Sequence, residues 1–498
     1  MILRNLLRDI EYECIQGNVD QEIAALVYDS RKVEKGAAFV CLKGAKFDGH
    51  AYAQQAVLDG AVALIVEDSA ISAQGTDGDV TIIRVKNTRE ALAFLSRNWF
   101  GNPASKLKVI GLTGTKGKTT TTHMLKKILE AAGHKVGMIG TLGAFIGEEK
   151  YPTKNTTPES YELHKLFAKM LEEGCEYAVM EVSSQAMKLG RAAGIEFAYG
   201  AFLNITPDHI SPDEHKDFQE YLDCKKLLFK QTGPVVVNID DPHWQEATEL
   251  AKDRLIKVSC QPRENGEADY IASDIENYWE SGHVGVLFHL NRFAESIFVN
   301  MPGHFNVENA LIALALADDL GIPEECIRAG LSKVTVKGRT QLLPYTNGHT
   351  TMLIDYAHNA VSMENLLSML KAYKPARLIC LFGGGGNRAK ARRYDMGLAA
   401  GKYADLTVLT MDNPRDEEVE EINKTIIEGL DVHHGKYMTI IDRKEAIQYL
   451  IDHAEPGDII ALIGKGHEEY QEIKGQKYYF SEEKIVEEYC KEKYGSIM

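Results

Sequence analysis

The stretch "KVIGLTGTKGKTTTTHML", residues 108–125, decides how the centre of this chain folds. Its first five residues have the apolar content and length of a buried strand, and "KTTTTHML" begins a helix. Between them, the order Gly-Thr-x-Gly-Lys-Thr lets backbone N–H groups curl inward, as in a phosphate-binding turn. Lys118 is expected to reach the outer phosphates of a nucleotide, and the Thr119 hydroxyl to ligate Mg²⁺. The residues predicted to bind the nucleotide from this stretch are Gly114, Thr115, Lys116, Gly117, Lys118, Thr119 and Thr120.

Composition sets limits on the class of protein. A chain of 498 residues is too long for one hydrophobic core and predicts two to four domains. The net charge of −16 argues against nucleic acid as the main partner. The N-terminus lacks the pattern of a secretory signal, and no run approaches the ~18 apolar residues needed to span a bilayer. The eight cysteines are scattered without a C-x-x-C pair, so we expect no zinc site, no disulfide framework and a cytoplasmic location.

The order of apolar and polar segments predicts an α/β protein of three domains. Residues 1–105 form an N-terminal domain, 106–335 a central P-loop nucleotide-binding α/β domain, and 336–498 a C-terminal domain. In the last domain, the runs "TMLIDYAH", "RLICLFGGG", "LTVLTMD", "YMTIID" and "DIIALIG" alternate with helical segments. Such alternation predicts parallel strands with right-handed crossovers, which is a doubly wound, Rossmann-like sheet.

Polar clusters follow the predicted strands of the last domain. "DYAHN", "GGGGNR", "DNPR" and "GKGHEE" each come directly after an apolar run. Because ligands of doubly wound sheets bind beyond the carboxyl ends of the strands, we expect a binding site on this rim.

Three further residues in the central domain are candidates for metal chemistry. Glu181 ends the apolar run "EYAVMEV", where a magnesium-binding carboxylate is expected, and His209 lies in "NITPDHISPDEH". Lys225 and its neighbour Lys226 lie about 100° apart on a predicted helix, so only one can point away from Leu227 and Leu228.

Ten motifs in the same order resemble the Mur ligase family. They are "GTKGKTTT", "NTTPES", "EVSSQAMKLGR", "NITPDHISPDEH", "YLDCKKLLF", "NVENALIALA", "GR" at 338–339, "DYAHN", "DNPR" and "GKGHEEYQ". The segment "YDSRKVEKGAAFVCLKGAKFDGH" is similar to the uridine-binding domain of that family. The resemblance therefore covers nearly the whole chain.

The resemblance implies an ATP-dependent amide ligase of peptidoglycan precursor synthesis. Such an enzyme adds the third amino acid, here meso-diaminopimelate, to UDP-N-acetylmuramoyl-L-alanyl-D-glutamate through an acyl phosphate, and forms ADP and phosphate. It implies two Mg²⁺ ions and a CO₂-derived carbamate on Lys225, whose Tyr-x₃-Lys-x₂-Leu spacing matches the family. Its partners are the nucleotide-sugar dipeptide and a diamino acid, with no nucleic acid and no membrane, and we expect a monomer.

Residue roles carry over from the same motifs. Lys118, Lys225 and His209 are expected to be catalytic, and the metal ligands to be Thr119, Glu181, carbamylated Lys225 and His209. Asn309, Arg339 and Asp355 are expected to contact ATP. The nucleotide-sugar dipeptide is expected to contact Ser30, Thr156, Thr157, Ser183 and Arg191. The residues expected to bind the incoming amino acid are Arg388, Asp412, Asn413, Pro414, Arg415, Gly464 and Glu468.

Departures from the family pattern leave alternatives open. Lys116 and Leu189 replace an Asn and a Gln, Gln341 replaces a Glu, and Asn387 and Ala389 replace acids on either side of Arg388. An L-lysine-adding ligase or a diverged ligase with another amine or acceptor is the first alternative. Arg415 favours diaminopimelate, because an arginine can bind a distal carboxylate that lysine lacks. Alternatives from other classes are a non-catalytic nucleotide-binding subunit or switch and a dinucleotide oxidoreductase. Against the oxidoreductase, Arg388 occupies the third glycine position of the G-x-G-x-x-G fingerprint.

Overall fold

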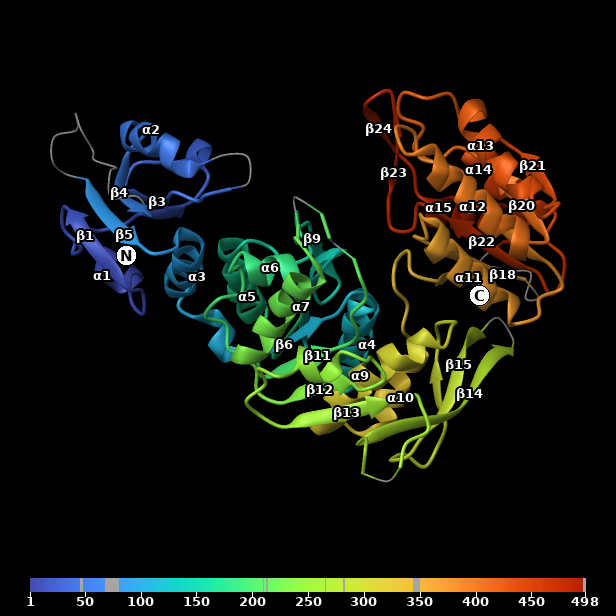
Figure 1. The fold of residues 1–498 in the computed structure, drawn as a ribbon, viewed down its shortest axis with the longest axis horizontal. Helices are drawn as coiled ribbons and strands as arrows, with labels where there is room; N and C mark the ends of the chain where they lie inside the picture. Colours follow the sequence, from blue (N-terminus) through green and yellow to red (C-terminus); the bar gives the residue numbers. More distant parts are fainter. Residues whose placement is uncertain are drawn as a thin grey trace. The chain divides into compact units, whose positions relative to one another are not determined.

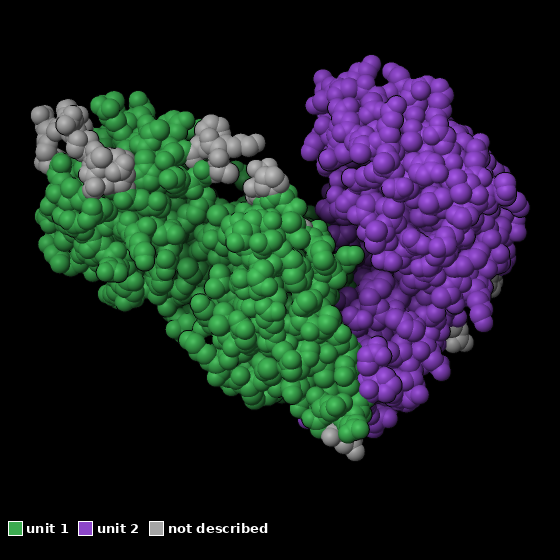
Figure 2. Space-filling model, viewed as in Figure 1, with its two compact units in different colours: residues 1–259, 263–269, 312–323 green, residues 260–262, 270–311, 324–498 purple. Residues whose placement is uncertain are grey.

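The computed structural model describes residues 1–44, 48–67, 80–208, 210–211, 214–264, 266–280, 283–343 and 350–495. The chain forms two compact units (Figures 1 and 2). Unit 1 consists of Met1–Ser259, Arg263–Asp269 and Ile312–Pro323, and unit 2 of Cys260–Pro262, Tyr270–Leu311 and Glu324–Met498. The domain boundaries predicted at residues 105 and 335 stay predictions, because the two compact units divide the chain at other residues.

The described residues of the N-terminal part form a five-stranded sheet in the order β1-β5-β4-β3-β2. β1 pairs antiparallel with β5, and the other neighbours pair in parallel. β3 and β4 are almost entirely apolar because separate cores cover the two faces of the sheet. The bounds are β1 (Tyr12–Gln16), β2 (Ala25–Val27), β3 (Ala37–Val40), β4 (Ala61–Val66), β5 (Thr81–Val85), α1 (Leu3–Leu6), α2 (Ala53–Leu58) and α3 (Thr88–Trp99).

The central part of unit 1 contains a sheet in which the strands follow the order β13-β12-β11-β6-β10-β7-β8-β9. The strands from β13 to β7 are parallel, and β8 and β9 continue antiparallel. Because β6 lies between β10 and β11, the residues that follow these three strands meet at one edge. The strand bounds are β6 (Lys108–Thr113), β7 (Val136–Gly140), β8 (Gly143–Ile146), β9 (Glu149–Tyr151), β10 (Tyr177–Glu181), β11 (Tyr199–Phe202), β12 (Val235–Asn238) and β13 (Leu255–Ser259).

Helices connect these strands and confirm the predicted alternation. The apolar runs "KVIGL", "EYAVMEV", "YGAFLNI" and "PVVVNI" form β6, β10, β11 and β12. The bounds are α4 (Lys118–Ala131), α5 (Ser160–Glu172), α6 (Ser184–Lys188), α7 (Phe218–Lys226) and α8 (Trp244–Ala247). Helix α9 (Phe305–Asp319) follows β16 (Ile297–Val299), and its residues up to Leu311 are assigned to unit 2 and the rest to unit 1. This apolar helix ends shortly before Gly321, which has a φ of 81°.

Unit 2 contains the doubly wound sheet, in the order β17-β18-β22-β19-β20-β21. β17 is antiparallel and the other neighbours pair in parallel. Helices α11, α12 and α13 cover one face, and α14 and α15 cover the other. The predicted α/β fold is therefore confirmed. The bounds are β17 (Gln341–Leu343), β18 (Thr351–Asp355), α11 (Ala360–Lys371), β19 (Leu378–Phe382), α12 (Lys390–Tyr403), β20 (Leu406–Leu409), α13 (Val419–Asp431), β21 (Tyr437–Thr439), α14 (Arg443–Asp452), β22 (Ile459–Ile463) and α15 (Glu482–Tyr494).

Smaller elements complete unit 2. An antiparallel ribbon comprises β14 (Tyr270–Glu280), β15 (His283–Leu290) and β16 (Ile297–Val299), and α10 spans Glu324–Ser332. A hairpin of β23 (Tyr470–Ile473) and β24 (Gln476–Tyr479) follows β22. Across the described ranges, the helices are too short or too polar to cross a membrane.

Candidate active site

The phosphate turn lies between β6 and α4, as predicted. Gly117 caps α4 with a φ of 86°, a conformation that glycine adopts without strain. Asn204, which follows β11, accepts the Thr115 N–H at its carbonyl and the Lys116 N–H at its side-chain oxygen, both at 2.9 Å. The turn is thus fixed by a neighbouring strand as well as by its own sequence.

Two lysines meet at this turn. Lys118 Nζ donates to the carbonyl of Gly114 at 2.7 Å and to that of Thr115 at 3.1 Å. Lys225 Nζ, on α7, donates to the same Gly114 carbonyl at 2.9 Å. The two side chains that the sequence places more than a hundred residues apart therefore converge on one oxygen atom.

Lys225 has an unusual environment for a lysine. Only 1% of it is exposed, and its Nζ lies 4.5 Å from the centre of the Tyr221 ring. Burial, and then the charge of Lys118, lowers the pKa of Lys225 well below its usual value. A neutral amine is what reaction with CO₂ requires, so the residue fits the predicted carbamate.

Lys226 contrasts with its neighbour. Its ammonium bonds Glu246 at 3.0 Å, Glu249 at 3.1 Å and Asp223 at 3.0 Å. Burial acts to lower the pKa of Lys226, but these carboxylates more than offset it and raise that pKa above its usual value. The structure therefore favours Lys225 over Lys226 as the reactive amine.

Glu181 and Thr119 form a site that suits magnesium. Glu181 is buried at the end of β10, and its Oε1 accepts the Thr119 hydroxyl and the Thr141 N–H, both at 2.9 Å. A Cβ at Gly140 would lie 2.2 Å from this oxygen, so only glycine leaves room for the carboxylate. Among the described residues, no three His, Cys, Asp or Glu side chains gather as a metal cluster. Magnesium needs no such cluster, since it commonly takes one or two protein oxygens together with phosphate oxygens and water.

One cavity brings several predicted residues together. A cavity of about 260 Å³ in unit 1 is lined by Lys118, Lys225, Thr156, Ser183 and Arg191. Further lining residues are Asn155, Ser184, Gln185, Glu214, His215 and Tyr221. The same cavity is therefore lined by residues that separate motifs predicted to bind the phosphates and the acceptor.

The remaining predicted acceptor residues lie apart from this cavity lining. Thr157 is buried, and its hydroxyl donates to the Glu181 carbonyl at 2.9 Å and accepts the Ser183 N–H at 3.1 Å. Ser30 begins a 3₁₀ turn in the N-terminal part, after Asp29. Their contacts with the acceptor stay predictions. His209 lies outside the described residues.

The residues predicted to contact ATP from outside the turn belong to unit 2, so that contact stays a prediction. Asp355 ends β18, and its two oxygens accept the N–H groups of Thr340 at 2.7 Å and Ala357 at 2.8 Å. Burial raises the pKa of Asp355. The Arg339 guanidinium lies 5.1 Å from the centre of the Tyr356 ring, and Asn309 is buried on α9.

The predicted amino-acid site forms one hydrogen-bonded cluster on the rim of unit 2. Asn413 Nδ2 donates to Glu468 Oε2 at 3.0 Å, which joins the segments after β20 and β22. The Gly386 N–H donates to the Asn413 carbonyl at 2.8 Å, which adds the segment after β19. Pro414 is buried beside Gly386, and Gly464 follows β22 with a φ of 110°.

Arg388 is exposed in the turn after β19, and its neighbour explains one departure from the family pattern. Asn387 donates from Nδ2 to Asp416 at 2.7 Å. An acid at position 387 would repel Asp416, whereas the amide binds it. The amide of Asn387 therefore suits this chain, because the neighbouring Asp416 supplies a carboxylate that accepts its hydrogen bond.

Sequence reasoning missed two charged residues of this cluster. Lys465 is 0% exposed, and its Nζ bonds Asp412 Oδ1 and Asn413 Oδ1, each at 3.1 Å. Glu472 accepts from Arg415 Nε at 3.0 Å. Lys465 had a signal, since it stands in "GKGHEE" directly after a strand, but Glu472 had none.

Comparisons with known proteins agree with this geometry. The model described as "Mur ligase family, catalytic domain" matches residues 22–100. "Mur ligase middle domain" matches 112–317, and "Mur ligase, glutamate ligase domain" matches 338–466.

Relatives and solved structures extend the match over the chain. The UDP-N-acetylmuramoyl-L-alanyl-D-glutamate–2,6-diaminopimelate ligase of Clostridium perfringens is 41% identical over 98% of this chain and 99% of its own. The protein of that name from Caldanaerobacter subterraneus is also 41% identical, over 98% of both chains. A solved structure with the same name has a TM-score of 0.75 at 26% identity and covers 100% of both chains. MurF of Thermotoga maritima in complex with ADP has a TM-score of 0.56 at 19% identity, over 90% of this chain and 94% of its own, and supports the fold alone.

The fold and the phosphate turn define a nucleotide-binding α/β enzyme. More particularly, the chain belongs to the Mur ligase family, as the sequence predicted. Mur ligases are ATP-dependent ligases that use Mg²⁺, so the predicted enzyme class, ATP and magnesium are confirmed.

Proposed function

We propose that this chain adds meso-diaminopimelate to UDP-N-acetylmuramoyl-L-alanyl-D-glutamate in peptidoglycan precursor synthesis, with conversion of ATP to ADP and phosphate. The Clostridium and Caldanaerobacter relatives that carry this activity in their names support it. The observation that carries the proposal is the pair Lys118 and Lys225. Their nitrogens bond one carbonyl oxygen and line the same cavity as Thr156, Ser183 and Arg191.

The chain's own residues favour activation of an acid. ATP and Mg²⁺ supply the phosphoryl group and the metal charge that convert the acceptor's terminal carboxylate into an acyl phosphate. Thr119 and Glu181 would hold the metal, and Lys118 would offset the negative charge that gathers between the nucleotide and the carboxylate. Arg191 is oriented by Glu159 at 2.9 Å and presents its guanidinium to the acidic acceptor. An amine of the amino acid then attacks the acyl carbon, and phosphate leaves.

Lys225 serves this reaction as a carbamate. Its neutral amine attacks CO₂, a C–N bond forms, and one proton leaves the nitrogen. The product is a carboxylate near the ammonium of Lys118, which shares the Gly114 carbonyl with Lys225, and it would offer magnesium a further oxygen ligand. The lowered pKa of Lys225 supports this step, because a charged ammonium has no lone pair for the attack.

A second candidate substrate is L-lysine. Arg415 is the residue expected to bind the distal carboxylate of diaminopimelate, but its guanidinium is paired with Glu472. This pairing lowers the net positive charge that the ammonium of L-lysine would meet, which keeps lysine as the second candidate. Diaminopimelate stays the first choice because it presents a carboxylate to Arg415 that lysine does not have.

We further propose that the chain acts as a cytoplasmic monomer. All eight cysteines are free thiols, which supports a reducing compartment. Light scattering after size exclusion tests the monomer directly, and a mass of twice 55.4 kDa would contradict it.

Mass spectrometry of products tests the proposed reaction. The purified protein is given UDP-N-acetylmuramoyl-L-alanyl-D-glutamate, ATP, Mg²⁺ and an equimolar mixture of meso-diaminopimelate, L-lysine and L-ornithine. We expect the diaminopimelate adduct to dominate and phosphate release to require both acid and amino acid. Phosphate release without either substrate would contradict a ligase. The Lys118→Ala variant, measured in parallel, controls for contaminating activity.

A further inference from the structure

Arg415 and Glu472 form an ion pair inside the predicted amino-acid site. Arg415 Nε donates to Glu472 Oε2 at 3.0 Å, and Nη1 donates to the Gly386 carbonyl at 2.7 Å. The two side chains are 23% and 26% exposed, so a ligand can reach both. Sequence motifs point to Arg415 alone, whereas the structure presents a cation and an anion side by side.

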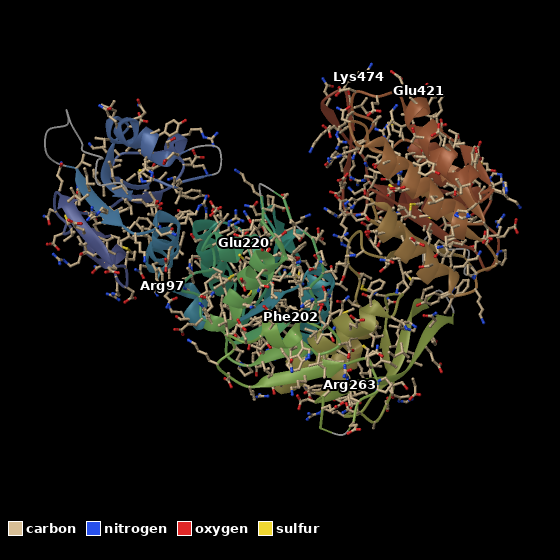
Figure 3. The ribbon with its side chains drawn as sticks, in the orientation of Figure 1. Arg97, Phe202, Glu220, Arg263, Glu421 and Lys474 are labelled. Carbon is tan, nitrogen blue, oxygen red and sulfur yellow. The ribbon has the colours of Figure 1, made fainter. Side chains whose placement is uncertain are left out.

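Backbone contacts fix this pair in place. Arg415 has a φ of 52°, and its N–H donates to the Glu472 carbonyl at 3.0 Å. Its carbonyl accepts the N–H of Lys474, which Figure 3 labels at the turn between β23 and β24. The Glu472 N–H donates to Asn413 Oδ1, the atom that also accepts from Lys465. Glu472 is therefore tied to the same cluster as the residues expected to bind the amino acid.

The contacts of Arg415 leave one edge of its guanidinium directed toward a ligand. A guanidinium binds a carboxylate through two parallel N–H groups, either at the Nε–Nη2 edge or at the Nη1–Nη2 edge. Glu472 occupies Nε, and Gly386 occupies one of the two hydrogens of Nη1. The Nη1–Nη2 edge thus remains for a carboxylate, with the Glu472 carboxylate next to it.

We propose that Glu472 is a specificity-determining residue that, with Arg415, forms a dipolar subsite for a distal carbon carrying both a carboxylate and an ammonium. The inference rests on the proposed function and names the feature of the diamino acid that the site selects. The ligand carboxylate binds Arg415 and the ligand ammonium binds Glu472, so each charge meets its opposite.

Ligands with one distal charge fit this subsite less well. A distal ammonium alone, as in L-lysine, draws Glu472 away from Arg415 and places two cations side by side. A distal carboxylate alone, as in 2-aminopimelate, satisfies Arg415 but lies beside the Glu472 carboxylate. Only the end group with both charges pairs with both residues and avoids like-charge contacts.

Steady-state kinetics of Glu472→Gln with meso-diaminopimelate and 2-aminopimelate tests the proposal. We expect KM for meso-diaminopimelate to rise about tenfold, because a charge-assisted hydrogen bond is lost, while kcat at saturation stays within about twofold. KM for 2-aminopimelate should stay the same or fall, because the repelling carboxylate is gone. Glu487 is an exposed carboxylate on α15, so Glu487→Gln is the matched control and should leave both KM values unchanged.

Two results would overturn the proposal. If KM for meso-diaminopimelate is unchanged or falls in Glu472→Gln, Glu472 does not recognise the distal ammonium, although the proposed function stands. If the unmodified protein forms no diaminopimelate adduct, the proposed function and this inference fall together. Melting curves of Glu472→Gln and Glu487→Gln show whether each variant keeps the fold. A change in KM is interpreted only for a variant that is folded.

Discussion

Two fully buried lysines, one at the phosphate turn and one on the rim of unit 2, have opposite surroundings. Lys225 is 1% exposed, and the hydrogen bond of its Nζ goes to a neutral acceptor, the Gly114 carbonyl. Lys465 is 0% exposed, but it bonds Asp412 and Asn413. Burial, and then the charge of Lys118, lowers the pKa of Lys225 and favours its neutral, reactive amine, whereas the Nζ of Lys465 bonds and positions Asp412 and Asn413. In the proposed function, the first lysine belongs to the site that performs the chemistry and the second to the site that recognises the amino acid.

Among the variants that test this comparison, replacement of Lys225 should give the largest loss of activity. Lys225→Ala should reduce ligation by on the order of 10²–10³-fold, because it removes the group proposed to carry the carbamate. Added acetate should restore part of the rate by supplying a carboxylate in the vacated space. Initial rates of phosphate release with both substrates present measure this.

Lys226→Ala is the matched control for that variant. It removes an adjacent lysine whose charge is paired with Glu246, Glu249 and Asp223. Activity within about threefold of the unmodified protein is expected. Equal losses of activity in Lys225→Ala and Lys226→Ala would mean that the different surroundings of the two lysines do not make Lys225 the reactive one.

His164 extends the comparison to a buried titratable side chain that does not line the cavity. Among the described residues, neither ring nitrogen has a hydrogen-bond partner. Burial, then the charge of Arg97 on α3, lowers the pKa of His164 to about 4. The unfolded chain takes up its proton near pH 6.5, so stability is complete above that pH and declines as the pH falls toward 4.

The His164 effect can be isolated by substitution. The free energy of unfolding should fall by up to about 3 kcal/mol from this residue over that interval. In His164→Leu this contribution should be absent, while activity at pH 8 is kept. Calorimetric melting of both proteins at several pH values measures the difference, and parallel pH profiles would show that His164 is not the cause.

Lys465 gives the smallest expected effect. Lys465→Met keeps the length of the side chain but removes the charge that holds Asp412 and Asn413, so KM for the amino acid should rise about tenfold. The rate at saturation should change far less, because Lys465 does not reach the reacting atoms in this account of the site. A loss of kcat with no change in KM would contradict a positioning role. The variant Lys465→Arg should recover part of the affinity.

Local patterns made the phosphate turn and the alternation of strands and helices predictable. The segment from β6 to α4 is continuous in sequence, so roles for Gly117, Lys118 and Thr119 could be predicted from spacing. The polar segments after β18, β19, β20 and β22 could be placed on one rim because parallel strands end together. The choice of Lys225 over Lys226 needed the family resemblance, and the structure supplies the physical reason in their different partners.

Long-range partners account for what the sequence did not reveal. Lys465 and Asn413 are 52 residues apart, and Arg415 and Glu472 are 57 apart, so no local pattern connects them. Thr157 was assigned to the acceptor because of its hydroxyl, but sequence cannot show that this hydroxyl donates to the Glu181 carbonyl. The direction in which a side chain points depends on residues of distant segments that pack against it.

Oxygen transfer from the acid to phosphate tests the central claim most directly, namely that the protein activates a carboxylate by phosphorylation before an amine attacks it. The acceptor is labelled with ¹⁸O in both oxygens of its terminal carboxylate and turned over with ATP and meso-diaminopimelate. The predicted result is one ¹⁸O atom in each phosphate released and the other in the new amide. Phosphate without ¹⁸O, formed at the same rate as the amide, would contradict activation through an acyl phosphate.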